Sequence, residues 1–422
     1  AGPTERTDGT MTQHVFVVGM NELNAERLKH LRGVEDVVFH PLLTSAAPIY
    51  DRPTERPAYL DELSEGSVEP PERLGDTLEQ LLASPNICSR GRIYEQYDHM
   101  VGVGTAVRPG GGDAAVLRVP GTDGALAIAS DCNSRYCYLD PREGARLAVA
   151  ECARNLACVG ATPAGTTDCL NFGNPENPEI MWQFVEAVEG MAQACGALDA
   201  PVVSGNVSLY NATDAGNIYP TPTVAMVGRF EQGLGDGSGP GWCGSGFQQA
   251  GDAVILLGET DEADIGGSEY LWLRDEQLGK RPPRLDLERE RAVQSVVREL
   301  VQSGLAASAH DCSEGGLGVA LAESCLSARE ELGVELSGIP GERPDLTLFS
   351  ETPSRVIVSC RREDAAELVA RARSEGVPVF RLGEVTEQPR LKWDGVVDVA
   401  VARLRAAWEA GLDVVDTADG SG

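Results

Sequence analysis

The chain has 422 residues, enough for two or three domains with substantial cores, and 42% of its residues are hydrophobic while 5% are aromatic. Its 65 acidic and 35 basic residues give a formal net charge of −30, which would repel nucleic acid and anionic membranes and argues against both as partners. No apolar run approaches the ~20 residues that cross a bilayer, and residues 1–10 lack the apolar region of a secretion signal, so we expect a cytoplasmic protein.

Lysine is scarce among the basic residues and occurs only at positions 29, 280 and 392. An acidic, lysine-poor composition indicates adaptation to high salt, because the screening length falls to ~3 Å at 1 M ionic strength. A calcium-binding acidic protein is the competing interpretation, but the acids are dispersed and no EF-hand loop is present. The eleven cysteines form no C-x-x-C pair and no regular framework, which predicts buried free thiols.

Residues 1–47 form an atypical N-terminal segment, whose pattern predicts a strand over 14–20 and a helix over 24–32. This β-α step is too short to fold as a domain by itself. Residues 48–83 are rich in proline and acid, which indicates an extended linker that ends in a short helix over 74–83.

Residues 84–235 alternate strand and helix patterns and form the first predicted domain. Asp140 and Pro141 mark the start of one helix as its cap and first residue, and Gly160 marks its end. A second helix is expected from about 177 to 195. The expected strands of this domain are 114–119, 125–130, 201–204 and 223–228.

A glycine-rich stretch, 236–250, separates this domain from the next and is predicted as a flexible linker, because it lacks the Gly-Lys-Ser/Thr ending of a phosphate loop. Residues 251–400 form a second α/β domain, and residues 401–422 a helix with a frayed acidic tail. The expected elements of the second domain are strands at 253–257, 355–359 and 378–382 and helices at 286–303, 316–327 and 363–375.

Two polar stretches, 166–175 and 204–211, flank the helix at 177–195. We expect them to be loops at the same end of a sheet, where ligands usually bind. Their amide and carboxylate oxygens suit Mg²⁺, and their glycines allow main-chain N–H groups to approach phosphate; turn formation and helix capping are the alternative role. The polar and glycine residues concerned are Asp168, Asn171, Asn174, Gly205, Asn206 and Ser208.

Six motifs, spread over about residues 48–400, together resemble the second half of phosphoribosylformylglycinamidine synthase, the large ATP-dependent ligase subunit of purine biosynthesis. The pair of polar stretches is one motif. The others are SPNI at 84–87, YEQYDHM at 94–100, DCN at 131–133 with YLDP at 138–141, GSEYL at 267–271, and HD at 310–311 with SEGGL at 313–317.

This resemblance implies a nucleotide-binding synthetase domain of the aminoimidazole ribonucleotide synthetase type followed by a second α/β domain. It implies ATP and Mg²⁺ as cofactors, with Asp168 and Gly205 contacting ATP, Asn206 binding Mg²⁺ and Ser208 contacting the substrate. In the implied reaction ATP activates the amide oxygen of formylglycinamide ribonucleotide and ammonia then displaces phosphate, which gives formylglycinamidine ribonucleotide.

The family's catalytic histidines lie in its first half, so no catalytic residue is assigned in this chain. Residues 131–136 hold an acid but no histidine, and residues 350–353 depart from the family's substrate motif. The implied partners are the first half, in cis or in trans, a glutaminase subunit and a small bridging subunit. Two alternatives stay open: a regulatory module with a structural nucleotide site, and another ATP-dependent synthetase or kinase of the same fold.

Overall fold

The computed structural model describes residues 51–230 and 241–412, together with four two-residue strands nearer the N-terminus. The chain divides into two units, Ala1–Pro53 and Thr54–Gly422. The first contains β1 (Thr4–Glu5) antiparallel to β2 (Met11–Thr12), and β3 (His14–Val15) parallel to β4 (Asp36–Val37). The first two residues of the strand predicted at 14–20 form β3. Four predicted segments lie outside the described residues: the rest of that strand, the helix at 24–32, residues 233–240 and the tail from 413.

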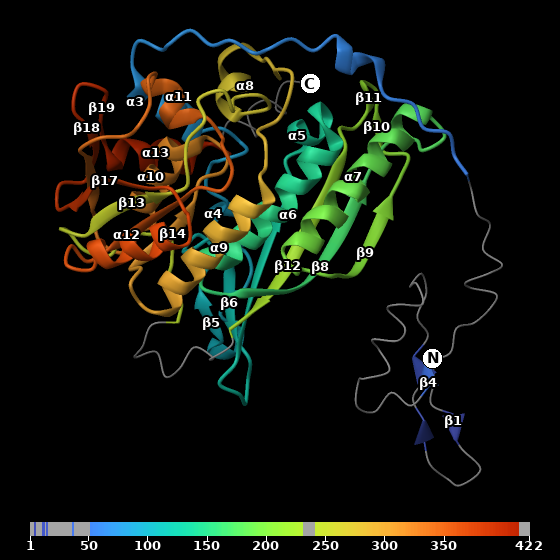
Figure 1. Ribbon diagram of the computed structural model, residues 1–422, viewed down its shortest axis with the longest axis horizontal. Helices are drawn as coiled ribbons and strands as arrows, with labels where there is room; N and C mark the ends of the chain where they lie inside the picture. Colours follow the sequence, from blue (N-terminus) through green and yellow to red (C-terminus); the bar gives the residue numbers. More distant parts are fainter. Residues whose placement is uncertain are drawn as a thin grey trace. The chain divides into compact units, whose positions relative to one another are not determined.

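The first sheet of the second unit has six strands, and three helices accompany it (Figure 1). In order across the sheet the strands are β5 (Thr105–Val107), β6 (Ala115–Arg118), β7 (Ala125–Asp131), β12 (Thr221–Arg229), β8 (Thr162–Asn171) and β9 (Val202–Ser208). The helices are α5 (Ser134–Leu139), α6 (Pro141–Cys158) and α7 (Pro178–Ala197), and a small hairpin, β10 (Ala212–Thr213) with β11 (Gly216–Asn217), precedes β12. Every neighbouring pair is antiparallel except β8 and β9.

Within the described part of the chain, the helices cover one face of this sheet and leave the other open. Strand β7 alternates buried and exposed residues along its length, as a half-covered strand does. Its inward alanines, with Val224 and Met226 of β12, pack against α6 and α7 in one core. On the opposite face lie Leu126 and Ile128, which are 39% and 41% exposed.

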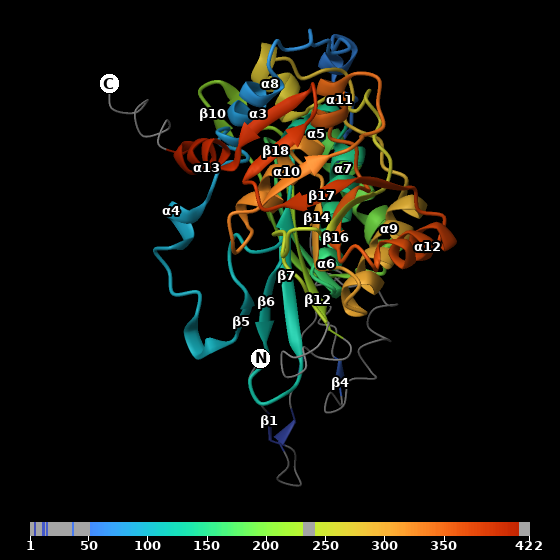
Figure 2. The same ribbon diagram turned by 90° about the vertical axis from the view of Figure 1, so that its left-hand side faces the viewer.

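The second sheet has seven strands and is covered by helices on both faces (Figure 2). The order is β14 (Ser308–Asp311), β16 (Val356–Cys360), β13 (Ala253–Leu257), β17 (Val379–Thr386), β15 (Gly333–Leu336), β18 (Arg390–Trp393) and β19 (Val397–Ala400). One core packs its strands against α3 (Leu74–Leu82), α10 (Gly316–Leu326), α11 (Pro344–Phe349) and α13 (Val401–Ala410). The other packs them against α9 (Leu287–Gln302), α12 (Ala365–Ser374) and the end of α6. Strands β13 and β16 are buried at every residue, as double coverage requires.

The proline-rich residues 54–73 are extended, as predicted for a linker, but they pack on the folded chain. Around the short helix η1 (Ala58–Asp61), the Tyr59 ring stacks on Tyr138 of α5 with centroids 4.3 Å apart. Further along, Val68 enters the core beside α8 (Glu269–Asp275), and its carbonyl accepts a 3.0 Å hydrogen bond from Arg343. Between α3 and β5 lie two further turns, α4 (Gly91–Tyr94) and η2 (Val101–Val103).

The predicted helices α6, α7, α9, α10 and α12 are present at nearly the expected bounds. The prediction of loops at 166–175 and 204–211 is wrong for most of their length, because residues up to Asn171 belong to β8 and residues up to Ser208 to β9. Within residues 51–230 and 241–412, no helix combines the length and the apolar content needed to cross a membrane.

Candidate functional site

The two polar stretches lie side by side, because they are neighbouring parallel strands joined by α7. The Asn177 side chain accepts a 2.9 Å hydrogen bond from the Glu179 amide and Pro178 opens the helix, so the chain turns sharply after β8. Helix α7 then returns the chain to the start of β9, a right-handed crossover being the usual way to join parallel strands. In the resulting register Asp168 pairs with Gly205 and Asn171 with Ser208.

The Asp168 carboxylate lies directly over Gly205. These are the two residues expected to contact ATP. A Cβ atom built on Gly205 would overlap the Asp168 carboxylate, so this position requires glycine while the carboxylate keeps its place. Partial burial raises the pKa of Asp168. In the register Asp168 is opposite Val224, which packs in the core against the helices, so its carboxylate lies on the helix-covered face.

Asn206 and Ser208 lie on the opposite, open face, because successive side chains of a strand alternate between faces. The exposed Asn206 side chain makes no hydrogen bond with a described residue, so its amide oxygen is available to a ligand. The Ser208 hydroxyl accepts a 3.1 Å hydrogen bond from Asn211. Asp168 and Asn206 therefore lie on opposite faces of the strand pair.

Two other predicted candidates have structural partners. Asn171 donates to the Cys169 carbonyl at 2.8 Å and to the Thr221 carbonyl at 3.3 Å, which ties β8 to β12. Asn174 accepts from the Glu176 amide at 2.9 Å and so forms the turn before α7. The capping and turn role expected as an alternative thus holds for Asn174.

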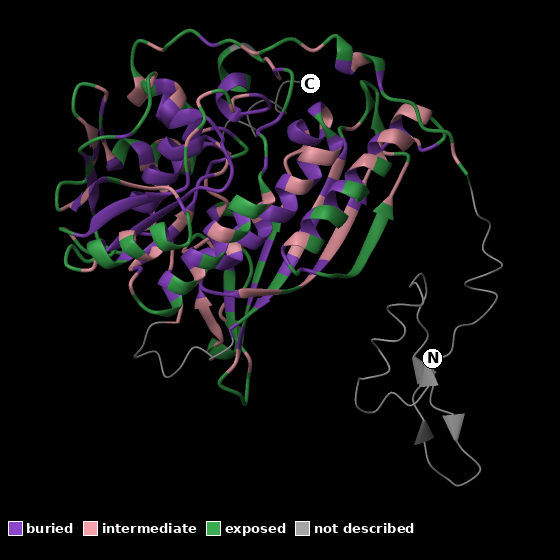
Figure 3. Cartoon of the chain, viewed as in Figure 1, coloured by how far each residue is buried: buried purple, intermediate pink, exposed green. Residues whose placement is uncertain are grey.

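The open face continues from polar side chains on β8 and β9 to apolar ones on β6, β7 and β12. Figure 3 shows β9, at one edge of this sheet, as exposed. Val227 of β12 is opposite Ile128 in the register, and Leu117 of β6 is opposite Leu126. These four side chains are 37–41% exposed and share one face, which makes a contiguous apolar surface. We call these four residues the open-face patch.

A second group of polar residues fills a cleft between the two sheets. Arg135 of α5 forms an ion pair with Glu269 of α8, and its Nε donates to the Gly267 carbonyl at 3.0 Å. The Tyr136 hydroxyl bonds to Glu351, whose other oxygen accepts from the Gly315 amide at 2.7 Å. A cavity of 390 Å³ adjoins this group and is lined by Asn86, Cys132, Asn133, Ser134, Arg135, Tyr219, Trp272 and Glu314.

Burial raises the pKa values of several carboxyl groups around this cleft. Burial and then the neighbouring Glu314 raise the pKa of Glu351 to about 7. Burial raises the pKa of Asp311 to about 7 although Arg154 opposes the shift. Burial together with neighbouring carboxyls also raises the pKa values of Asp131 and Glu151. Such shifts are common at functional sites, although buried ion-pair networks produce them too.

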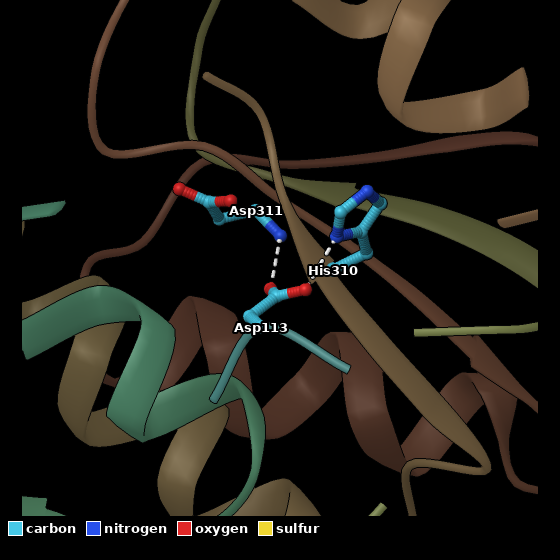
Figure 4. A group of neighbouring side chains, drawn as sticks. All are labelled: Asp113, His310 and Asp311. Carbon is cyan, nitrogen blue, oxygen red and sulfur yellow. Dashed lines mark hydrogen bonds and ion pairs between the residues drawn. The ribbon is translucent and has the colours of Figure 1, made fainter. Parts of the chain in front are cut away.

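Asp113, His310 and Asp311 form a cluster that joins the two sheets (Figure 4). His310 Nδ1 lies 2.6 Å from Asp113, which also accepts from the Asp311 amide at 2.8 Å, and His310 Nε2 lies 3.1 Å from Glu323. The number and type of ligands would suit a metal ion. However, both ring nitrogens already face carboxylates and the Arg154 guanidinium bonds to Asp311 at 3.1 Å, so we interpret the cluster as a charge network.

The sequence contained the cleft residues as motifs but not their contacts. Asn133 and Glu314 are 181 residues apart in the chain, and a 3.3 Å hydrogen bond joins them. The quoted motifs at 84–87, 131–133, 267–271 and 313–317 all contribute to this one cleft. That these motifs meet at one place in the fold would identify them as parts of one site, and the sequence alone does not show this.

Comparison with known proteins matches two family models to the two sheets in order. The N-terminal domain model of AIR synthase related proteins matches residues 111–230, and the C-terminal domain model matches residues 249–394. The chain belongs to the AIR synthase related family. This confirms the expected fold class, an α/β synthetase domain of that type followed by a second α/β domain.

Curated relatives carry the name that the sequence motifs suggested. The chain is 52% identical to the phosphoribosylformylglycinamidine synthase subunit PurL of Moorella thermoacetica over 379 residues, which are 88% of this chain and 50% of that protein. It is 49% identical to the same subunit of an Anaeromyxobacter species over 402 residues, 92% of this chain and 51% of that protein. These matches confirm the family resemblance, and the chain spans about half the length of the curated relatives that it matches.

Solved structures share the fold at low sequence identity. A Thermotoga maritima PurL complexed with FGAR superposes with a TM-score of 0.59 at 19% identity, covering 79% of this chain and 54% of that one. A second structure from T. maritima, described as phosphoribosylformylglycinamidine synthase II, gives a TM-score of 0.61 at 19% identity, covering 79% and 52%. The two-sheet arrangement is therefore that of the AIR synthase related fold.

Proposed function

We propose that this chain forms part of an ATP-dependent carbon–nitrogen ligase of purine biosynthesis. The complete enzyme would convert formylglycinamide ribonucleotide, ATP and glutamine-derived ammonia to formylglycinamidine ribonucleotide, ADP and phosphate. Curated relatives named PurL support this proposal, as do similar structures described as complexed with FGAR and with ATP. The observation that carries it is the β8–β9 pair, where Asp168 lies over Gly205 on one face and Asn206 and Ser208 lie on the other.

Each residue of the strand pair has a role that its chemistry fits. Gly205 has no side chain, which leaves room for the Asp168 carboxylate over it, and this half-exposed carboxylate would contact the nucleotide. The free amide oxygen of Asn206 suits Mg²⁺, which takes its remaining ligands from water and phosphates; bound Mg²⁺ would neutralise charge on the nucleotide. The Ser208 hydroxyl would contact the substrate.

The proposed reaction has two steps, and this chain contributes positioning to both. The substrate amide oxygen attacks the γ-phosphorus of ATP and ADP leaves; ammonia then adds to the activated carbon, loses a proton and expels phosphate. Most catalysis of such transfers comes from alignment and charge stabilisation. No acid or base in the strand pair is assigned to the proton transfer, which we attribute to the complementary half.

We propose that the remainder of the synthase packs against the open-face patch. The chain spans about half of its relatives, and an apolar sheet face needs a covering layer. A T. maritima structure described as PurLQS supports association with further subunits, which we propose to be a glutaminase and a small bridging subunit. Purine synthesis from these soluble substrates would take place in the cytoplasm.

An engineered charge tests this packing. Ile128→Glu should abolish association with a complementary first half made from the Moorella thermoacetica relative, because a buried unpaired carboxylate costs several kcal/mol. Val188→Glu is the matched control, since Val188 is 39% exposed on α7, outside the patch, and Ile128 is 41% exposed. Analytical ultracentrifugation measures the complex. Equal association of both variants would show that the patch is not the interface.

Nucleotide binding by the assembled halves tests the strand pair. Asp168→Ala should weaken Mg-ATP binding about tenfold or more, because a hydrogen bond to a charged group contributes roughly 1.5–3 kcal/mol. Asn206→Ala should weaken binding with Mg²⁺ more than binding without it. Asp214→Ala, in the exposed hairpin after β10, is the control for loss of one carboxylate.

Calorimetric titration gives the affinities, and formation of the amidine product gives turnover. Wild-type affinity in both site variants would reject the assignment of these residues. Binding without any turnover by the assembled halves would instead favour a regulatory module with a structural nucleotide site.

A further inference from the structure

A cavity of 780 Å³ lies apart from the strand pair and from the cleft. Its walls come from the end of β5, from residues 242–248 between the two sheets, and from the turns that follow α9 and α10. None of its lining residues takes part in the proposed ligase function. Its size falls within the range of about 300–1,000 Å³ that is usual for small-molecule sites.

The charge of this cavity is opposite to that of the chain. Among the described residues of its lining, Arg108 and Arg329 are the only charged ones and no side chain is acidic. Four other cavities of the described chain each include at least one acidic residue. In a chain with 65 acidic and 35 basic residues, a cavity whose described lining has two arginines and no carboxylate would concentrate anions.

Both arginines are available to a ligand. Neither Arg108 nor Arg329 forms an ion pair or a side-chain hydrogen bond with a residue in the described part of the chain. Many other arginines are paired, as Arg142 is with Glu186 at 2.7 Å.

The cavity wall is formed by close main-chain packing. A Cβ atom on Gly244 would overlap the Gly111 carbonyl, and one on Gly246 would overlap the Ser327 carbonyl. The Ser245 amide donates to Gly111 at 3.3 Å, which joins residues 242–248 to the turn after β5. Trp242 is partly buried against the first core and also lines the cavity, so it offers an aromatic surface at a fixed position.

We propose that this cavity binds a phosphate monoester of a small sugar-containing molecule. Two guanidinium groups match the geometry and charge of a phosphate, and the volume is much larger than inorganic phosphate requires. The sugar would lie toward Trp242 and the main chain of residues 244–246.

Titration of the full chain with ribose 5-phosphate tests this proposal. Calorimetry should show saturable binding, and tryptophan fluorescence should change in the wild type but much less in Trp242→Phe. The double variant Arg108→Gln with Arg329→Gln should bind at least about tenfold more weakly, because it removes the charge-assisted hydrogen bonds.

A matched double variant separates site binding from general loss of positive charge. Arg291→Gln with Arg373→Gln removes two exposed arginines from α9 and α12 and should change affinity less than about twofold. Ribose without phosphate should show no saturable binding. Three outcomes would overturn the proposal. These are equal weakening in both double variants, saturable binding of ribose, and binding of inorganic phosphate as tight as that of ribose 5-phosphate.

Discussion

The β8–β9 strand pair and the interdomain cleft have similar residue chemistry but very different surroundings. Both contain carboxylates, amides and glycines that the sequence motifs brought to notice. In the cleft, the buried Glu351 carboxylate accepts hydrogen bonds from the Tyr136 hydroxyl and from the main-chain amides of Gly315 and Glu269. On the strand pair, Asn206 is exposed and has no described side-chain partner.

The buried, fully hydrogen-bonded groups stabilise the fold, whereas the exposed groups without partners are available to bind a ligand. A buried charged group with its full set of partners stabilises the position of two sheets, and removing one partner is costly. An exposed amide on a rigid strand costs little to keep and is free to bind. The comparison can be tested by perturbing each region and measuring stability and binding separately.

The largest expected effect is on the buried network. Arg154 is 2% exposed and bonds to Glu290 at 2.9 Å and Asp311 at 3.1 Å. Arg154→Met should lower the free energy of unfolding by about 3–5 kcal/mol, because it leaves buried carboxylates without their cation. Denaturant titration in high salt measures this change. Arg371→Met, at an exposed pair with Glu299, should change stability little; a similar loss in both variants would contradict the contrast.

A smaller, pH-dependent effect is expected at His310. Burial lowers the pKa of His310, but Asp113 and Glu323 raise it more, so the folded-state pKa lies well above its ordinary value. Protonated His310 therefore stabilises the fold below about pH 6.5, and this contribution is lost as pH rises through the folded-state pKa.

The variant His310→Gln should consequently be less stable than wild type at about pH 6, with the difference shrinking as pH rises through the raised folded-state pKa. Urea unfolding at a series of pH values measures this difference. A stability difference that stays constant with pH would show that the His310 charge does not contribute.

Gly205→Ala tests the strand pair with almost no expected cost in stability. The new methyl group would displace the Asp168 carboxylate, so Mg-ATP binding by the assembled halves should fall roughly tenfold. In a Gly205→Ala, Asp168→Ala double variant the two losses should not add, because both act through one carboxylate. Calorimetry measures affinity, and thermal unfolding serves as the control. Fully additive losses would show that Gly205 acts independently of Asp168.

Salt should produce the smallest effect and act on the exposed charges alone. Raising KCl from ~0.1 M to ~1 M shortens the Debye length from ~10 Å to ~3 Å and should relieve repulsion among the surface acids. We expect the melting temperature to rise by about 2–4 °C, which corresponds to an increase of roughly 1 kcal/mol in the free energy of unfolding. The loss caused by Arg154→Met should stay the same, since that network is buried. A flat or falling melting temperature would reject the high-salt interpretation of the composition.

Helix ends were predictable from the sequence because their signals are local. Asp140 accepts from the Arg142 and Glu143 amides, and Pro141 begins α6 as the sequence indicated. The same reasoning located α7 from Asn177 and Pro178. These residues act on neighbours two or three positions away, so a single sequence contains the whole interaction.

Strands β8 and β9 were mistaken for loops because their stability comes from outside the segment. Residues 166–171 have no regular apolar alternation, yet β12 and β9 hydrogen-bond to both sides of β8. Pairing of this kind overrides local β propensity. The candidate residues were found from the two polar stretches and their roles from the family resemblance. Their division between two faces depends on strand register, which one sequence does not specify.

The distribution of thiols gives each of the two compared regions its own reporter. Nine of the eleven free cysteines are buried, and the two partly exposed ones are Cys132 and Cys169. Cys132 lines the cleft cavity, and Cys169 pairs with Asn206 in the β8–β9 register. A thiol-directed fluorophore or spin label would therefore react first at these two positions. Protection of Cys169 by the complementary half, with Cys132 left reactive, would map the interface without any added mutation.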